Sequence, residues 1–240
     1  MLTVALKKDR LFGAHMSIAG GLHEALLAGA SVGCDVIQLF SKSSNQWRAK
    51  PIQPEEVALF QKTRETTGVT PAMIHAAYLI NLCTPKEEAW VQSVDALQVE
   101  VERAETLSVP YLVVHPGAHV GSGEEAGIAR AAQALNLIHA RTAGFKTKIL
   151  IELTAGQGTC IGHRFEHVAG ILSQVTSEDR VGVCFDTCHV FAAGYDLRTP
   201  AAVNATLKKF DQIIGLDRLV LIHANDSKAD FGAHLDRHEH

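Results

Sequence analysis

The chain has 240 residues, 47% of them hydrophobic, which is enough to bury one large core. Its formal net charge of -4 at pH 7 shows no overall attraction to nucleic acid or to a membrane surface. Bound divalent cations would add positive charge, so this balance does not exclude a DNA partner. No stretch approaches the roughly 20 apolar residues of a membrane span, and the five cysteines lack framework spacing. We therefore expect a soluble, cytoplasmic protein with free thiols and no membrane partner.

Short apolar runs alternate with helical patterns along the whole chain, without a linker that would divide it. The runs predict strands at Leu11–Ala14 and Val36–Phe40, and then at 72–74, 111–114, 149–151, 181–185 and 219–222. Helices are predicted at Gly21–Ser31, Pro54–Thr67, Lys86–Leu107, Glu124–Ala143, Phe165–Gln174 and Pro200–Ile214. Thr84 before Pro85 and Thr199 before Pro200 are typical of helix N-caps.

Seven strand–helix repeats without reversal favour a TIM-type (β/α)8 barrel over an open doubly wound sheet. The pattern predicts a single barrel domain over residues 1–240, with the eighth βα unit missing. Seven strands would leave the first and last partly unpaired. We expect a C-terminally incomplete chain, with a non-closing or partner-completed barrel as the alternative.

Five of the apolar runs end directly before a residue that can bind a metal. These residues are His75, His115, Glu152, Asp186 and His223. Parallel strands place their C-terminal ends on one face, so the five side chains should converge there. A lone His or Asp after a strand is commonly a cap or a satisfied polar group. Five in the same relative position indicate one shared site.

Two further pairs of potential ligands accompany the strand ends. Asp186 and His189 are three positions apart, so a helical turn starting there would put His189 one turn further along. The two side chains can then serve different metals. Asp236 and His238 are two apart, and in an extended loop both point to the same side, where they can chelate one ion.

Several short segments stand out along the chain. They are Gly13-Ala14-His15-Met16-Ser17, Gln46-Trp47-Arg48, His115-Pro116-Gly117, Glu152-Leu153-Thr154-Ala155-Gly156-Gln157-Gly158, Asp186-Thr187-Cys188-His189, His223-Ala224-Asn225-Asp226-Ser227-Lys228 and Asp236-Arg237-His238. Together they resemble the endonuclease IV family, the zinc-dependent apurinic/apyrimidinic endonucleases of base excision repair. The resemblance covers about residues 11 to 240.

The resemblance implies three zinc ions at the top of a barrel. His75 and His115 would hold the first, and Glu152, the catalytic bridging ligand, would join it to the second. Asp186 and His223 would bind the second. The ligands of the third would be His189, Asp236 and His238. Imidazole and carboxylate ligands without thiolate suit open hydrolytic zinc sites, and Mn²⁺ can occupy some oxygen-rich positions.

The resemblance also implies the reaction and its substrate. A metal-bound hydroxide would hydrolyse the phosphodiester 5′ to an abasic site in double-stranded DNA, leaving a 3′-hydroxyl and a 5′-deoxyribose phosphate. Loops after the strands would grip bent DNA and occupy the place of the missing base. The predicted DNA contacts are Asn45, Gln46, Trp47, Arg48, Tyr78 and Leu79, with Lys42 and Lys228 on phosphates. We expect a monomer for the complete family member.

Two departures from the family pattern keep other functions open. The family's eighth strand ends in a Glu that ligates the second zinc, and that strand lies beyond His240. Leu153 stands where the family commonly has Asn. The alternatives are a non-catalytic zinc-binding remnant of the family and a metal-dependent sugar-isomerase-like barrel enzyme.

Overall fold

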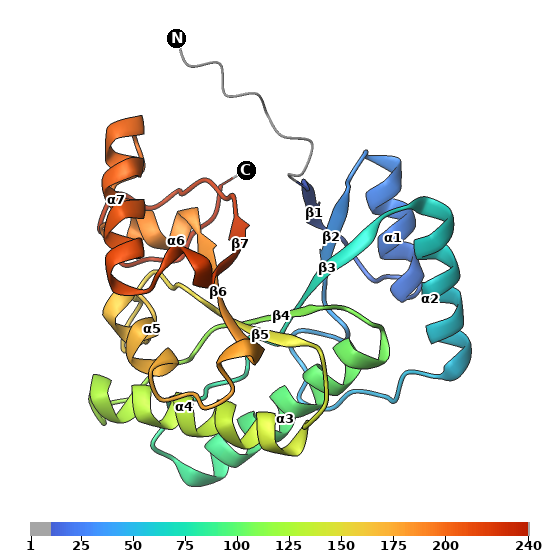
Figure 1. Cartoon of the computed structure of the whole chain (residues 1–240), viewed down its shortest axis with the longest axis horizontal. Coiled ribbons are helices and arrows are strands. Elements are labelled where there is room, and N and C mark those ends of the chain that lie inside the picture. Colours follow the sequence, from blue (N-terminus) through green and yellow to red (C-terminus); the bar gives the residue numbers. More distant parts are fainter. Residues whose placement is uncertain (1–10, 240) are drawn as a thin grey trace.

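A computed structural model describes residues 11–239 and contains one parallel sheet. Its seven strands are β1 (Gly13–His15), β2 (Val36–Leu39), β3 (Thr70–His75), β4 (Tyr111–Val114), β5 (Lys148–Glu152), β6 (Val181–Asp186) and β7 (Leu219–His223). Each strand pairs in parallel with the next along the chain, so the spatial order is the sequence order. The sheet curls strongly, which brings β1 and β7 round toward the same side of the molecule (Figure 1).

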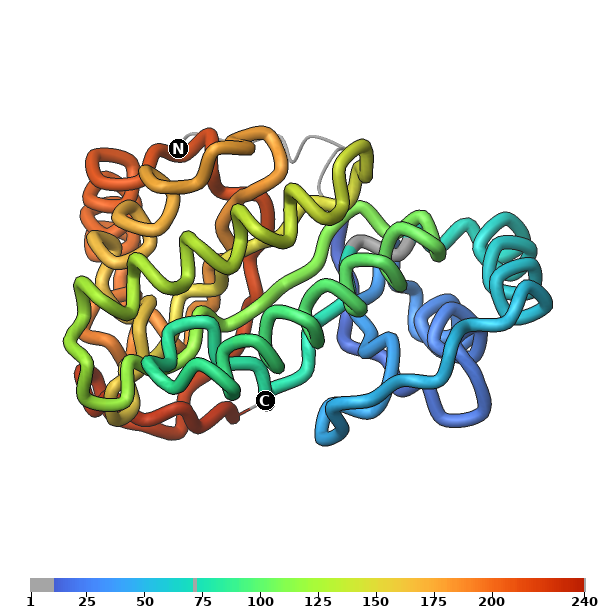
Figure 2. The backbone as a smooth tube through the Cα atoms, turned by 90° about the horizontal axis from the view of Figure 1, so that it is seen from below, coloured from blue at the N-terminus to red at the C-terminus, as the bar shows by residue number. Residues whose placement is uncertain are grey.

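Helices connect successive strands and lie outside the curled sheet (Figure 1). They are α1 (Leu22–Ser31), α2 (Pro54–Thr67), α3 (Glu87–Thr106), α4 (Glu124–Arg141), α5 (Phe165–Leu172), α6 (Thr187–Ala192) and α7 (Pro200–Ile213), with short 3-10 turns η1 (Glu178–Arg180) and η2 (Leu216–Arg218). Helices α1 and α2 pack side by side, as do α3 and α4 (Figure 2). This arrangement confirms the predicted TIM-type barrel, and residues 11–239 supply seven of its eight strands. No helix within that range is long and apolar enough to cross a membrane.

The two predicted N-caps have different outcomes. The Thr199 hydroxyl accepts a hydrogen bond from the Ala202 N–H at 3.2 Å, which confirms the cap of α7. The prediction for Thr84 is wrong, because α3 begins at Glu87 with Lys86 as its N-cap. The Thr84 hydroxyl instead accepts from the Lys86 N–H at 3.3 Å, so it closes the turn before the helix.

Burial falls from the middle of the sheet to its edges. The outer face of the central strands packs against the helices through fully buried side chains such as Leu97 and Phe165. The inner face holds a small separate cluster of Met73, Val113, Leu150 and Cys184. The edges are different: all of β1 is exposed, and β7 alternates between half-buried and exposed residues.

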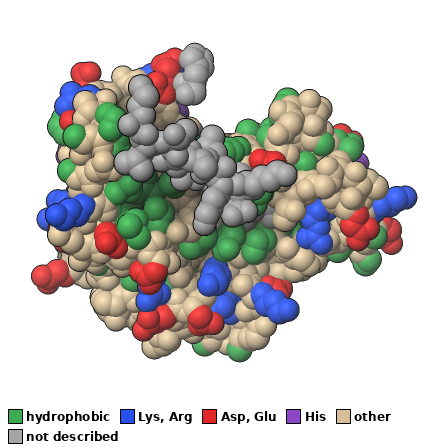
Figure 3. Space-filling model, turned by 45° about the horizontal axis from the view of Figure 1, so that its top comes forward, with side chains coloured by type: hydrophobic (Ala, Val, Ile, Leu, Met, Phe, Trp, Pro, Cys, Tyr) green, Lys and Arg blue, Asp and Glu red, His purple; other side chains and the backbone are tan. Residues whose placement is uncertain are grey.

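Apolar side chains are exposed beside these edge strands. Phe12, just before β1, is 68% exposed, and Ile222 on β7 is 54% exposed. In the space-filling view, hydrophobic side chains line the hollow of one face (Figure 3). Among residues 11–239, the edge strands therefore lack the covering that the central strands have.

Candidate metal centre

The five predicted strand-end residues meet at one end of the sheet. His75, Glu152, Asp186 and His223 are the last residues of β3, β5, β6 and β7, and His115 directly follows β4. Asp186 and His223 are direct neighbours in the register of β6 and β7. The convergence follows from parallel pairing, which aligns the carboxyl ends of the strands.

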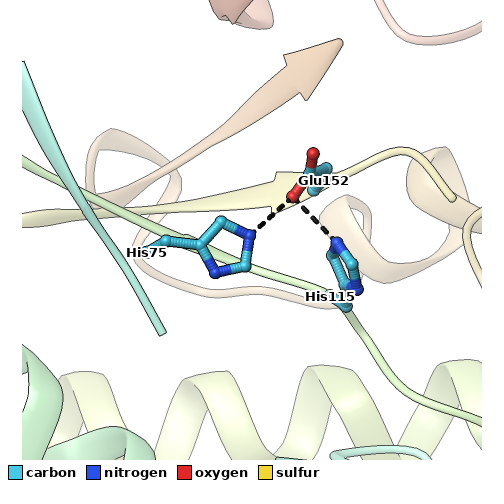
Figure 4. A group of neighbouring side chains, drawn as sticks. All are labelled: His75, His115 and Glu152. Atoms are coloured by element: carbon cyan, nitrogen blue, oxygen red, sulfur yellow. Dashed lines mark hydrogen bonds and ion pairs between the residues drawn. The ribbon is translucent and has the colours of Figure 1, made fainter. Parts of the chain in front are cut away.

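Glu152 lies at the centre of the group and faces different partners with its two carboxylate oxygens. Its Oε2 is 3.1 Å from His75 Nε2 and 3.0 Å from His115 Nε2 (Figure 4). Its Oε1 is 2.7 Å from His223 Nδ1 and 3.6 Å from His189 Nδ1. A carboxylate with each oxygen turned to a separate set of nitrogens has the geometry of a bridging ligand.

The imidazole neighbours of Glu152 stabilise the ionised form of its carboxyl group. Burial by itself would raise the pKa of this carboxyl group. The charge of His115 and hydrogen bonds with His115, His223 and His75 outweigh that effect and hold the pKa well below its usual range. Glu152 is 1% exposed, so its negative charge is shielded from bulk solvent.

Asp186 links β6 to α6 and points its second oxygen into the site. Its Oδ1 accepts the His189 N–H at 2.9 Å and so caps α6, which confirms that a helical turn starts there. Its Oδ2 accepts from Asn225 Nδ2 at 2.6 Å and is 3.8 Å from His223 Nδ1. Three residues on three segments are thus ordered around one carboxylate.

A third group forms around His189. Its Nε2 is 3.1 Å from Asp236 Oδ2 and 3.3 Å from His238 Nε2, and His238 Nε2 is 3.2 Å from Asp236 Oδ1. Asp236 and His238 therefore point to the same side, as predicted. Burial would lower the pKa of His189, but its hydrogen bond with Asp236 and the charges of Asp186 and Glu152 raise the pKa to about 9.

Backbone and amide acceptors fix which imidazole nitrogens face the site. His75 Nδ1 donates to the Ala76 carbonyl at 2.7 Å, and His189 Nδ1 donates to the Leu153 carbonyl at 2.9 Å. A carbonyl oxygen can only accept, so Nδ1 carries a proton in both rings, and Nε2 is the nitrogen turned to the site, where a metal would take the place of any proton it carries. The donor set of imidazole nitrogens and carboxylate oxygens, with the rings held in these orientations, fits zinc.

Gln38 orients His223 in the same way, and sequence reasoning missed it. Its Oε1 accepts from His223 Nε2 at 2.7 Å, which leaves His223 Nδ1 facing Glu152. Its Nε2 donates to His15 Nδ1 at 2.8 Å, so His15 in turn fixes the amide. Gln38 is the one polar residue within the otherwise apolar strand β2, and this polar position could have indicated a role in the site.

Two thiols lie close to the nitrogen and oxygen donors of the centre: Cys184 is grouped with Glu152 and His223, and Cys188 with Asp186 and His238. Cys184 Sγ is 3.5 Å from His223 Nδ1, but burial and the charge of Glu152 raise the pKa of this thiol well above its usual value. Cys188 Sγ donates to the Arg237 carbonyl. Both are free and buried, which agrees with the prediction of free thiols.

The side chains predicted to contact DNA lie in two loops beside the centre. Asn45, Gln46 and Arg48 are exposed, and Trp47 is half-buried and packs against the core. In the second loop, Tyr78 is 60% exposed and Leu79 is 37% exposed. The Tyr78 ring lies 5.2 Å from the His75 ring and 6.0 Å from the His115 ring.

The two predicted phosphate-binding lysines differ in accessibility. The Lys228 side chain is 56% exposed, with Nζ 3.2 Å from Glu239 Oε2. Lys42 is buried, and its Nζ lies 3.1 Å from Glu100 Oε1. This burial and pairing contradict the expected phosphate contact of Lys42, because a buried ammonium group with a carboxylate partner cannot reach a DNA backbone.

Another group of possible ligands lies away from this centre. Glu124, His163 and His167 have donor atoms within 4.8 Å of one another. The Arg164 guanidinium donates to Glu124 there, the Gly162 N–H donates to His167 Nδ1, and His167 Nε2 lies 3.2 Å from Glu124 Oε2. A guanidinium cation already balances this carboxylate, so the group does not have the open donor set of the strand-end centre.

The fold and the strand-end cluster define a barrel of the xylose isomerase-like TIM class, whose family model matches residues 26–240. The chain is 49% identical over 229 residues to a probable endonuclease 4 from Chloroflexus aggregans, covering 95% of this chain and 80% of that protein. Among solved structures it resembles endonuclease IV from Thermus thermophilus, with a TM-score of 0.82, 36% identity, and coverage of 96% of this chain and 82% of that one. The chain belongs to the endonuclease IV family.

A more distant match concerns the fold alone. The structure of a D-tagatose 3-epimerase-like protein shares a TM-score of 0.70 and 20% identity, covering 93% of this chain and 80% of that one. At this identity the likeness extends to the barrel and not to the chemistry.

Proposed function

We propose that the chain is a DNA repair endonuclease that hydrolyses the phosphodiester 5′ to abasic sites in double-stranded DNA. The products would carry a 3′-hydroxyl and a 5′-deoxyribose phosphate. Membership of the endonuclease IV family supports this reaction class over the sugar-isomerase-like alternative. With DNA as its substrate, the protein would work in the cytoplasm.

The observation that carries the proposal is the convergence of eight nitrogen- or oxygen-bearing side chains in three groups around Glu152 and Asp186. In the proposed assignment, His75 and His115 hold one zinc, Glu152 bridges it to a second, and Asp186 and His223 complete the second. The ligands of the third are His189, Asp236 and His238. Mn²⁺ is an alternative at the oxygen-rich positions.

When bound, the zinc ions would neutralise the phosphate, activate water near neutral pH and stabilise the leaving oxygen. The residues of the chain have separate tasks. Glu152 keeps two groups of donors at a fixed separation, and the hydrogen bonds of His75 and His189 fix their rings. Tyr78 and Leu79 project from the loop beside this centre, where they can contact the exposed deoxyribose of the abasic site.

Incision of a duplex carrying one tetrahydrofuran abasic analogue tests the proposal. The zinc-loaded protein should cut on the 5′ side of the analogue, a polymerase should extend the new 3′ end, and a chelator should stop the reaction. Glu152→Ala should lower the incision rate by at least about 10³-fold and reduce the zinc content, because it removes the bridge. Glu125→Ala, at an exposed position on α4, is the matched control and should cut like the parent chain.

The opposite result also has a defined meaning. If the chain binds about three zinc ions, melts cooperatively and still leaves the duplex intact, the endonuclease proposal is wrong. The protein is then a zinc-binding member of the family without this activity.

A further inference from the structure

Two loops beside the metal centre are tied to the same helix. The β2 loop (residues 40–53) joins β2 to α2, and the β3 loop (residues 76–86) joins β3 to α3. They carry all the predicted DNA contacts except Lys228. The two loops already touch near their starts, because the Phe40 ring meets the Tyr78 ring edge-on with 5.6 Å between the ring centroids.

Glu100 on α3 contacts both loops with one carboxylate. Its Oε2 accepts from the Ser41 hydroxyl at 2.8 Å, and its Oε1 is 3.1 Å from Lys42 Nζ, both in the β2 loop. The same Oε1 accepts the Ala77 N–H of the β3 loop at 3.3 Å. Glu100 is only 1% exposed, so each of these contacts is made away from water.

Lys42 extends the tie along the β2 loop. Its Nζ, while paired with Glu100, donates to the Gln46 carbonyl at 2.6 Å. One turn further along α3, Arg103 donates to the Ser41 hydroxyl at 3.0 Å and to the Lys50 carbonyl at 2.7 Å. The backbone of the β2 loop is therefore held at positions on both sides of Trp47.

We infer that Glu100 and Lys42 are positioning residues that set the β2 loop and the β3 loop at a fixed spacing for contact with damaged DNA. The inference rests on the proposed function. Stability alone does not call for a buried ion pair, since apolar side chains of similar size often replace one without loss. What an apolar pair cannot reproduce is the set of directional bonds to Gln46, Ser41 and Ala77.

Three variants separate positioning from folding: Lys42→Met, Glu100→Met and the double variant. Each single variant removes one partner of a buried ion pair and should lower the melting temperature. The double variant should regain most of that loss. Lys62→Met, on the surface of α2, is the matched control for the substitution itself. Glu100→Gln, which keeps an acceptor for Ala77, serves if a Met variant does not fold.

The first measurement is the kinetics of incision on the tetrahydrofuran duplex. Loose loops should raise KM by about tenfold, with kcat within about threefold and the zinc content unchanged. In the double variant the melting temperature should recover while KM stays high, and in Glu100→Gln KM should rise by less. If KM returns to the parent value together with the melting temperature, the pair serves folding alone and the inference is wrong.

The second measurement does not depend on cleavage. Of the two tryptophans, Trp90 is 4% exposed and lies under the Arg130 guanidinium, so acrylamide quenching reports mainly on Trp47. Quenching should increase in Lys42→Met and in the double variant but not in Lys62→Met. Unchanged quenching would overturn the inference even if the parent chain cuts DNA. A parent chain that does not cut would refute the proposed function, and the quenching would still show whether the β2 loop is tied.

Discussion

Strands β6 and β7 lie side by side and both end in a candidate ligand, yet they are supported differently. Every residue of β6 is buried, whereas no residue of β7 is. At their ends, Asp186 is 0% exposed and the His223 side chain is 14% exposed. The two candidate ligands thus occupy equivalent positions at strand ends, although one strand is buried and the other lies at the edge of the sheet.

The difference shows that packing and hydrogen bonding share the task of holding the centre. Asp186 and Glu152 stand on strands whose neighbours fill both faces, so close packing restricts their movement. His223 lacks that packing, and its ring is fixed instead by Gln38 on one side and Glu152 on the other. Substitutions in the two regions should therefore have effects of different kind and size.

The largest effect on stability is expected for Leu150→Ala in the middle of the sheet. Leu150 is fully buried and lies two residues before Glu152, on the same face of β5. The cavity should lower the free energy of unfolding by about 2–5 kcal/mol, measured by urea denaturation. Leu59→Ala, at a leucine 42% exposed on α2, is the control and should change it by less than about 1 kcal/mol. A cost for Leu150→Ala as small as that of the control would mean that the central strands are not tightly packed.

The sequence predicts those parts of the structure that follow from periodicity and chain order. Helix α2 begins at Pro54 and ends at Thr67, as predicted, because apolar spacing and flanking Pro and Gly mark both ends. The meeting of His75, Glu152 and Asp186 was predictable for a similar reason. Parallel connection alone brings the ends of consecutive strands to one side.

Features that depend on contacts between distant segments were not predictable in this way. Gln38 and His223 are 185 residues apart, and no local pattern indicates that one orients the other. Lys42 looks like a surface lysine in a polar loop. Its burial depends on its ion pair with Glu100, which lies far along the chain on α3. The sequence pattern of that helix marks its apolar positions and gives no sign that Glu100 is buried as well.

An intermediate effect is expected for Gln38→Ala, which tests the support of the edge ligand. His223 would keep its place on β7 but lose the acceptor that fixes its ring. In the proposed assignment, the affinity for the zinc that His223 would help to hold should fall by about 10–100-fold, measured by competition with a chromogenic chelator. Gln61→Ala is the matched control, since Gln61 Nε2 donates to the Leu107 carbonyl at 3.0 Å outside the centre. Equal zinc affinity in the two variants would show that strand pairing with β6 suffices to orient His223.

The smallest effect is expected for Ile222→Ala, one residue before His223. Ile222 is 54% exposed, so its truncation removes little buried surface and should cost less than about 1 kcal/mol in urea denaturation. This variant can break the comparison more directly than the other two. Because Ile222 and Leu150 are both aliphatic strand residues, a cost for Ile222→Ala close to that of Leu150→Ala would require a comparable burial. The outer face of β7 would then be covered in solution. The edge strand and the central strands would in that case be packed to a similar degree and would differ only in which residues pack against them.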